Sequence, residues 1–522
     1  MFNYQPEVVT EKLLRRIPNY IRFTFLSSFI IGLLTHAFMF LNKLPNTDEI
    51  NQVLCSMSRA SSGRWFLKYP TDLSSTFSMP WVNGLLSLVY LSVAACLVVA
   101  CLKIYKKFYC VLISALMISI PIVASTLAYM QSADGYFFAL MLACMSAYFA
   151  GKYKYGFIAA IPVIVLSLGC YQAYYGVAAG LMIMIVIFEL LDNQIPWKKT
   201  LFKGLRFVCS LGLGMVGYFV MVKLKMPSAG LTQYRGIDKM GQMPLQELPT
   251  RIINAYKYII SYFLLNRTEV HYSYMALLFA VSFLCCAVLI VIWCLNRKMY
   301  KEPMRIALIL LLLFLFPLGC SIVRVMDPLI PHMIMIYGVT LVPIFLVAVT
   351  ASYWDLSPMP EHKTDIPRKK SLQATAVSLS RWVITSTIVV CIFNYFIVSN
   401  QAYFRLIFAY EQTYAKSITL VSRIQEIEGY SWDKEIVLVG KPFLRENTPN
   451  SMPELHENAI RNTADFDELW YSYSYPRFLE RFIGFSQKVT FISRDIKTYP
   501  EIVEVITGKP RYPDEGSIFI VE

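Results

Sequence analysis

The sequence has few charged residues for its length. Asp, Glu, Lys and Arg make up 16% of its 522 residues, whereas soluble domains have about a quarter. Apolar residue types make up 56% of the chain, which excludes a water-soluble fold for most of it and favours the bilayer as solvent. The net charge of +14 does not indicate nucleic-acid binding, because Lys and Arg fall in short segments between apolar runs, where they set membrane topology.

Several motifs that carry chemistry in other proteins are missing. No His, Cys or Asp cluster has metal-ligand spacing, no glycine-rich phosphate loop is present, and no Gly-x-Ser-x-Gly occurs. Eleven of the twelve cysteines lie in or beside apolar runs and none follows Cys391, so we interpret them as small core residues without disulfides. We expect no metal site and no certain cofactor, and the need for a divalent metal stays open.

Long apolar runs fill most of the chain. A helix needs about 20 apolar residues to cross the hydrocarbon core. We therefore predict an α-helical polytopic membrane protein with about eleven spans, at 21–41, 79–102, 108–130, 134–150, 155–170, 172–191, 205–224, 273–295, 305–323, 331–351 and 381–400.

The loop charges predict the orientation of these spans. With a cytoplasmic N-terminus, each inner loop would hold two or more Lys or Arg and the short outer loops almost none, as the positive-inside rule requires. The outer loops near Asp134 and Tyr171 have none, and the one after Leu318 has only Arg324. An odd number of spans then places the C-terminal segment outside.

The composition changes near residue 400, so we expect a membrane domain at 1–400 and a small extracytoplasmic α/β domain at 401–522. Within the tail, apolar runs at 435–440, 488–493 and 517–522 predict strands, and 403–428 and 465–483 predict helices. Together with 42–78 and 225–272, the tail makes a third long outer segment. Long connections are often functional, which favours a site on the outer face.

The first outer segment has an acidic pair at the start of an expected helix. Residues 47–60 place apolar side chains on one stripe, with Asp48 and Glu49 in the first turn. One interpretation is structural: Asn46 caps the helix and Glu49 completes a capping box. The other is catalytic, because a carboxylate at the water–lipid boundary can act as a general base on a sugar hydroxyl.

Other residues of the outer segments suit a sugar phosphate. The candidates for binding the leaving phosphate are arginines. The candidates for binding the sugar include an aromatic ring and a polar amide. Asp134 either caps a helix or lines a cavity with the acidic pair. Trp65 fits an aromatic belt as well as a sugar site, and Arg324 also fits a salt bridge with Asp327. The phosphate candidates are Arg59, Arg64, Arg235 and Arg324, and the sugar candidates are Trp65, Tyr171 and Gln172.

Five stretches of the sequence, "NTDEI", "SSGRWF", "SADGYFFAL", "LSLGCYQAYYG" and "YPDEGSIFIVE", resemble the bacterial GtrII-type glucosyltransferases. The resemblance implies a GT-C membrane glycosyltransferase in the bacterial cytoplasmic membrane. It also implies a polyprenyl-phosphate-linked glucose donor and a surface polysaccharide acceptor such as O-antigen. The catalytic acid of that family maps onto Asp48 or Glu49, and Asp134 matches its second acidic position. Expected partners are the lipid bilayer, a donor-synthesising glycosyltransferase and a small flippase.

Two other classes share these features. A transporter or flippase of lipid-linked sugars would have similar spans, but the sequence shows no repeated halves and few acids deep within spans. A polymerase of lipid-linked glycans would use the same substrates. Addition of a single sugar, as opposed to a longer chain, separates the transferase from the polymerase.

Overall fold

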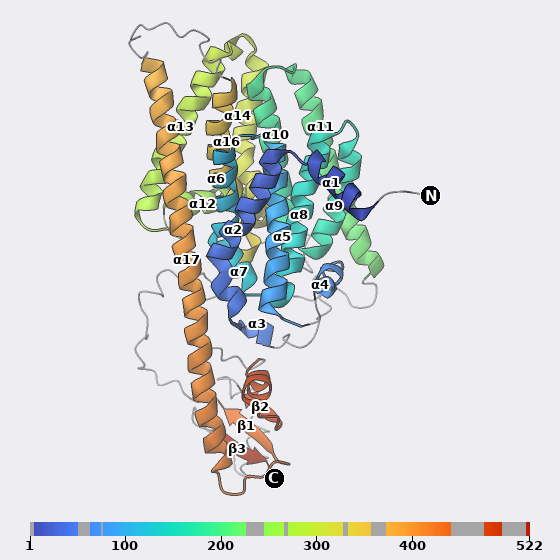
Figure 1. Cartoon of the computed structure of the whole chain (residues 1–522), viewed down its shortest axis with the longest axis vertical. Helices are drawn as coiled ribbons and strands as arrows, with labels where there is room; N and C mark the ends of the chain where they lie inside the picture. Colours follow the sequence, from blue (N-terminus) through green and yellow to red (C-terminus); the bar gives the residue numbers. More distant parts are fainter. Residues whose placement is uncertain are drawn as a thin grey trace.

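A computed structural model of the chain describes residues 5–50, 63–74, 77–225, 245–265, 270–326, 332–356, 372–439, 474–492 and 518–521. These residues form a helical bundle with a few strands beyond one end (Figure 1). The helices of the first half are α1 (Pro6–Arg16), α2 (Asn19–Leu41), α3 (Thr47–Ile50), α4 (Lys68–Ser74), α5 (Pro80–Cys101), α6 (Lys107–Ser119), α7 (Pro121–Leu127), α8 (Met130–Lys152), α9 (Gly156–Cys170), η2 (Gln172–Tyr174) and α10 (Tyr175–Asp192).

The second half continues the bundle and then leaves it. Its elements are α11 (Trp197–Lys225), η4 (Leu245–Glu247), α12 (Leu248–Phe263), α13 (Tyr274–Asn296), η5 (Met299–Lys301), α14 (Pro303–Cys320), α15 (Ile322–Met326), η6 (Met333–Met335), η7 (Tyr337–Thr340), α16 (Leu341–Leu356), α17 (Leu372–Gln425), β1 (Glu435–Val439), α19 (Tyr475–Phe478), the π-helical turn η8 (Leu479–Ile483), β2 (Val489–Ile492) and β3 (Ile518–Val521).

The helices confirm a helical membrane protein. In the described part of the chain, eight are long and apolar enough to cross a membrane, and the bent pair α6–α7 makes a ninth. The break in that pair lies at Pro121, which supplies no backbone N–H, and the two helices meet at 45°. The other expected spans fall on α9 and on η7–α16, which are shorter apolar helices, so the total of eleven stays a prediction.

One helix joins the bundle to the C-terminal strands. α17 has 54 residues, which at 1.5 Å each gives about 80 Å, far more than the roughly 30 Å of a bilayer core. It runs without a break across residue 400, where we expected a domain boundary. Tyr403 fixes it to α2 through a 2.7 Å contact with Nδ1 of His36, and Tyr395 lies 3.0 Å from Nε2 of His271.

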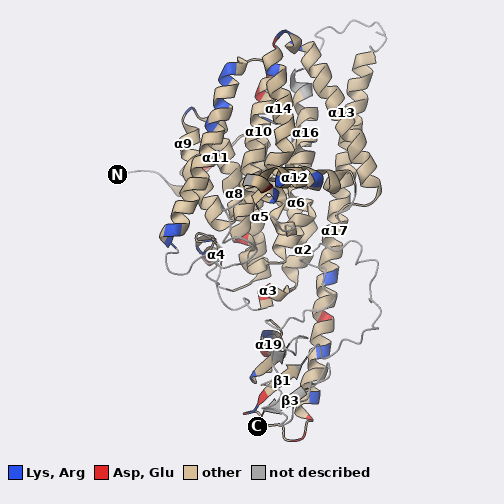
Figure 2. Cartoon of the chain, turned by 180° about the vertical axis from the view of Figure 1, so that it is seen from behind, with Lys and Arg blue, Asp and Glu red and all other residues tan. Residues whose placement is uncertain are grey.

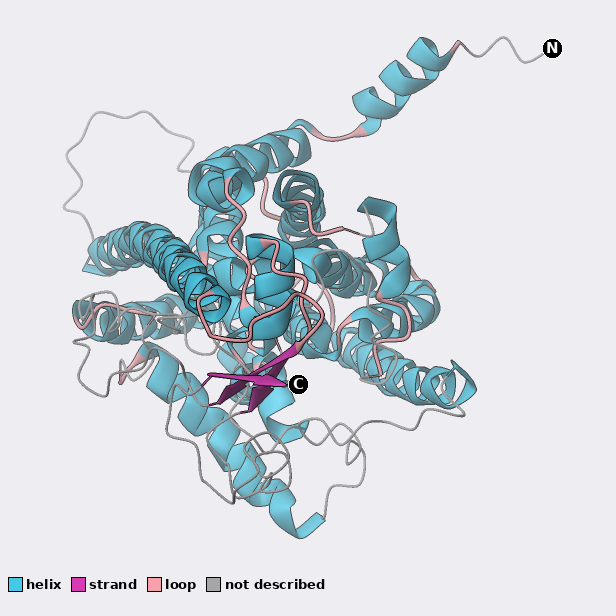
Figure 3. Cartoon of the chain, turned by 90° about the horizontal axis from the view of Figure 1, so that it is seen from below, coloured by secondary structure: helices cyan, strands magenta, loops and turns pink. Residues whose placement is uncertain are grey.

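The three strands that the tail predicts are present and form one sheet of order β2–β1–β3. β1 pairs in parallel with β2, with Ile436 opposite Val489, and antiparallel with β3, with Ile436 opposite Ile520. The expected helix 403–428 is the end of α17, and the described part of 465–483 forms α19 and η8. Seen along the bundle axis, the strands overlie the helices and α1 projects to one side (Figure 3). A separate α/β domain at 401–522 stays a prediction.

Candidate active site

The acidic pair lies in α3, at the end of the bundle nearest the strands (Figure 1). Asn46 caps this helix as predicted, because its Oδ1 accepts a 2.8 Å hydrogen bond from the backbone N–H of Glu49. The capping-box part of that prediction is wrong, because the Glu49 carboxylate turns to other partners. Asp48, in the same turn, is only partly buried. The two neighbouring acids therefore have different surroundings.

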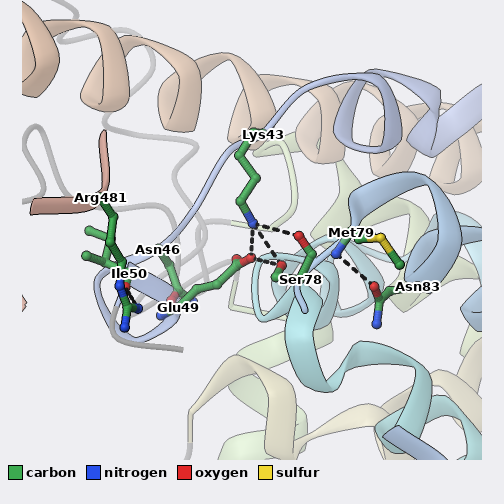
Figure 4. Close-up of polar contacts among 8 residues, drawn as sticks. All are labelled: Lys43, Asn46, Glu49, Ile50, Ser78, Met79, Asn83 and Arg481. Atoms are coloured by element: carbon green, nitrogen blue, oxygen red, sulfur yellow. Dashed lines mark hydrogen bonds and ion pairs between the residues drawn. The ribbon is translucent and has the colours of Figure 1, made fainter. Parts of the chain in front are cut away.

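The Glu49 carboxylate is fully buried and is held by two side chains (Figure 4). Its Oε1 accepts a 2.6 Å hydrogen bond from Nζ of Lys43 and another from Oγ of Ser78. Lys43 also donates to Oγ of Ser78 over 2.8 Å. Oε2 is buried with no hydrogen-bond partner among the described residues. This contact fixes α3 to the segment that leads into α5.

Replacing Glu49 by Gln is expected to lower the free energy of unfolding by about 1–3 kcal/mol, the range for a hydrogen bond to a charged group. The amide keeps the shape of the side chain but removes the charge that faces Lys43. Thermal unfolding in detergent would measure the change. A variant as stable as wild type would contradict an anchoring role for Glu49.

Asp134 is buried and belongs to the second turn of α8. Of the two interpretations of Asp134, the helix cap is wrong, because α8 begins at Met130 and its N-cap residue is Tyr129. The other, that Asp134 lines a cavity with the acidic pair, stays a prediction. Its Oδ2 accepts a hydrogen bond from Oγ of Ser74, and Oδ1 accepts one from the N–H of Gly135 over 2.8 Å. Asp134 therefore fixes the end of α4 to α8.

Asn83 connects the surroundings of the two buried acids. Its Oδ1 accepts from the N–H of Met79 over 3.0 Å (Figure 4). Its Nδ2 donates to Oγ of Ser74 over 3.0 Å. Ser74 bonds Asp134, and Ser78, next to Met79, bonds Glu49. The stretch from Ser74 to Asn83 thus carries partners for acids that lie far apart in the sequence.

Arg64 lies among tyrosine rings near the N-terminal part of α8, which also carries Asp134. Its Nη1 donates to the hydroxyl of Tyr136 over 2.8 Å. Its guanidinium carbon is 4.8 Å from the ring centroid of Tyr171 and 5.6 Å from that of Tyr136. Such cation–π contacts hold a guanidinium in place without neutralising it. Tyr136 follows Asp134 by two residues in α8, so Arg64 contacts the same part of α8 that carries this acid.

The predicted sugar residues border this arginine. Gln172 donates through Nε2 to the hydroxyl of Tyr218 over 2.8 Å, and that hydroxyl donates to the carbonyl of Gly63 over 3.3 Å. The loop before Arg64 is therefore tied to η2. Trp65 packs against Gly169 at the end of α9. The structure brings Arg64, Trp65, Tyr171 and Gln172 together.

A Gly169→Ala substitution is expected to destabilise the protein by about 1–3 kcal/mol through overpacking. A Cβ at this position would lie 2.7 Å from Cε2 of Trp65. Gly212→Ala in α11 is the control, because no heavy atom lies within 4 Å of a Cβ there. Thermal unfolding of both variants would check the difference, and equal stability would contradict the packing argument.

Other predicted residues lie elsewhere or outside the described part of the chain. Arg324 lies on α15 with its guanidinium 5.3 Å from the ring centroid of Tyr258 on α12, a different aromatic partner from those of Arg64. Arg59, Arg235 and Asp327 lie outside the described residues. Within the part of the chain that is described, no group of three His, Cys, Asp or Glu could hold a metal ion.

Sequence reasoning missed the residues that hold the acids and Arg64 in place. Around the acids these are Lys43, Ser74, Ser78 and Asn83, and beside Arg64 it is Tyr136. One signal was available. Asn83 is a polar residue in the first turn of an apolar helix, and polar groups at such positions usually mark function or a required hydrogen bond. The two serines gave no signal, because serine is common in loops and turns such as the segment before α5.

Comparison with known proteins agrees with this geometry. The family model described as glucosyl transferase GtrII matches residues 37–348, which include α3, α4, α8 and every described residue of the site. No curated protein and no solved structure matches the chain. Because the family model covers more than half of the chain, this membrane protein belongs to the GtrII glucosyl transferase family and is a glycosyltransferase.

Proposed function

We propose that the protein transfers glucose, or a related hexose, from a polyprenyl-phosphate-linked donor to a cell-surface polysaccharide, as a GT-C enzyme. The observation that carries the proposal is the convergence of the acidic turn of α3, Asp134 and Arg64 at one end of a membrane bundle. All three lie within the residues that match the glucosyl transferase family. The donor lipid would remain in the bilayer while the acceptor enters from water.

The distribution of charge supports an external site. Lys and Arg gather at the end of the bundle away from α3, around the start of α11 and the loop before α14 (Figure 2). Loops rich in Lys and Arg normally stay in the cytoplasm. We therefore propose that α3, the site and the C-terminal strands face the outside of the bacterial cytoplasmic membrane, with the N-terminus inside.

The surroundings of the two neighbouring acids support different roles for them. Glu49 is fully buried and already bonded to Lys43 and Ser78, so it anchors α3. Asp48 is partly exposed in the same turn and can meet an acceptor hydroxyl. We assign Asp48 as the general base and Glu49 and Asp134 as positioning residues, since both Asp134 oxygens accept hydrogen bonds.

The proposed step is a direct displacement. Asp48 takes the proton of the acceptor hydroxyl, and the hydroxyl oxygen forms a bond to the anomeric carbon. The bond from that carbon to the phosphate oxygen breaks, and its electron pair leaves with the polyprenyl phosphate. Attack opposite the leaving group inverts the anomeric configuration. No nucleotide takes part, because the lipid phosphate is the leaving group.

Arg64 is the proposed partner of the leaving phosphate. A guanidinium presents a rigid fork of N–H donors that matches phosphate oxygens, and the rings of Tyr136 and Tyr171 hold it in position. The indole N–H of Trp65 is buried without a hydrogen-bond partner in the described part of the chain, which suits contact with a sugar hydroxyl. Tyr171 and Gln172 complete the proposed sugar site, and Arg59, Arg235 and Arg324 stay further phosphate candidates.

The test uses membranes from a host without endogenous glucosyltransferases. Polyprenyl-phosphate-linked, labelled glucose would be supplied with surface polysaccharide, and the products would be resolved by size. We expect one sugar added per site and inverted stereochemistry, with none in membranes that lack the protein. Longer chains would identify a polymerase, and movement of donor across the membrane without product would identify a flippase.

A further inference from the structure

A second hydrophobic core lies beyond the bundle, where the end of α17 meets the sheet and α19. Its buried residues come almost entirely from the C-terminal part of the chain: Leu420, Ile424, Ile436, Leu438, Tyr475, Phe478, Leu479 and Phe485. The one other buried member within the described residues is Ile50, the last residue of α3, which is fully buried. The turn that carries the acidic pair is thus packed into the C-terminal core.

A hydrogen bond strengthens this contact. Nη1 of Arg481 donates to the backbone carbonyl of Ile50 over 2.8 Å (Figure 4). A hydrogen bond from a charged guanidinium to a carbonyl is stronger than one between neutral groups. Arg481 belongs to the π-helical turn η8, which ends at Gly484 with a φ of +78°. Single π turns of this kind often occur at functional sites.

The described residues of α3, Thr47–Ile50, are held by contacts at both of their ends. Its start is held by the Asn46 cap and by the contacts of Glu49 with Lys43 and Ser78. Its end is held by the side chain and carbonyl of Ile50, and both of these contacts come from the C-terminal part of the chain.

We infer that the C-terminal part of the chain completes the active site by fixing α3, with Ile50 and Arg481 as positioning residues for the acidic pair. The expected loss of activity rests on the proposed function, whereas the contact of the C-terminal part with Ile50 does not. A misplacement of about 1 Å can lower a reaction rate roughly 100-fold. Loosening the end of α3 therefore lowers kcat, while the donor still binds at Arg64 with an unchanged KM.

The test compares Arg481→Ala with Arg481→Lys and with a matched control in the full-length protein in lipid nanodiscs. Arg477→Ala is the control, because Arg477 is an exposed arginine two residues before Leu479 whose 2.6 Å ion pair with Glu480 stays within the same helical segment. Hydrogen exchange would follow the amides of Glu49 and Ile50, which bond the side chain and carbonyl of Asn46. Labelled-donor kinetics would give kcat and KM.

We expect Arg481→Ala to speed exchange at residues 46–50, to leave exchange in α8 unchanged, and to lower kcat about 10- to 100-fold at constant donor KM. Arg481→Lys should restore part of both effects, and Arg477→Ala neither. Unchanged exchange at 46–50, or unchanged kcat, in a folded Arg481→Ala protein would overturn the inference. If wild type transfers no glucose, the proposed function fails. Hydrogen exchange at residues 46–50 then tests by itself whether Arg481 holds α3 in place.

Discussion

Replacing Asp48 by Asn is expected to lower kcat about 100- to 10,000-fold, the range that a general base usually contributes. The amide is close in size to the carboxylate but cannot accept the proton of the acceptor hydroxyl. Donor KM should change little, because the proposed partner of the donor phosphate is Arg64, which this substitution leaves in place. Single-turnover transfer of labelled glucose in membranes that contain equal amounts of inserted protein would measure the effect.

Glu49→Gln provides the contrast for this experiment. It should lower stability more than Asp48→Asn does, because Glu49 is buried and bonded to Lys43 and Ser78, whereas Asp48 is partly exposed. At a temperature where both variants are folded, it should retain more activity than Asp48→Asn. If Glu49→Gln abolishes transfer while Asp48→Asn retains it, the two roles are reversed and Glu49 is the base.

The second large effect is expected for Arg64→Ala, which should lower kcat about 100- to 1,000-fold. Losses of this size are typical of groups that stabilise charge in the transition state. Charge grows on the phosphate as the sugar leaves it, so a fixed cation there acts mainly in the transition state. Arg64→Lys should restore little, because an ammonium lacks the planar fork and stacks poorly between Tyr136 and Tyr171.

Arg206→Ala is the matched control for the arginine. Its guanidinium lies 5.6 Å from the ring centroid of Phe157, and it belongs to the first half of α11, a helix that begins at the end of the bundle away from α3 (Figure 1). This substitution removes the same kind of cation–π contact but should leave transfer unchanged. Wild-type kcat in Arg64→Ala would exclude Arg64 from the phosphate site and leave Arg59, Arg235 and Arg324 as the candidates.

The sequence was sufficient for features that depend on local composition. Apolar runs longer than about 18 residues have few alternatives to a membrane helix, so the helical membrane class followed from them, as did most helix positions. Short apolar runs at 435–440, 488–493 and 517–522 predicted the three strands, which occur at Glu435–Val439, Val489–Ile492 and Ile518–Val521. The cap at Asn46 also followed, because capping depends on neighbouring residues only.

Tertiary structure decided how the acids are used, because their partners come from distant parts of the chain. No local pattern shows that Ser78 and Lys43 bury Glu49, or that Ser74 and Gly135 take both oxygens of Asp134. The same holds for Tyr136 beside Arg64, which is 72 residues away. The sequence left open which of Asp48 and Glu49 is the base and gave Asp134 as a second acidic position, and the differences in their surroundings come from burial and hydrogen bonding in the folded chain.

The sequence by itself therefore determined a membrane glycosyltransferase with an acidic pair after its first long apolar run, since hydrophobicity and short motifs are local properties. Only the folded chain shows that α17 continues through residue 400 and carries a second core to α3. A helix ends where its packing and hydrogen bonds end, and those of α17 extend from the bundle to the sheet. The contact between Ile50 and Arg481 joins residues 431 positions apart, and only packing of the whole chain brings them together.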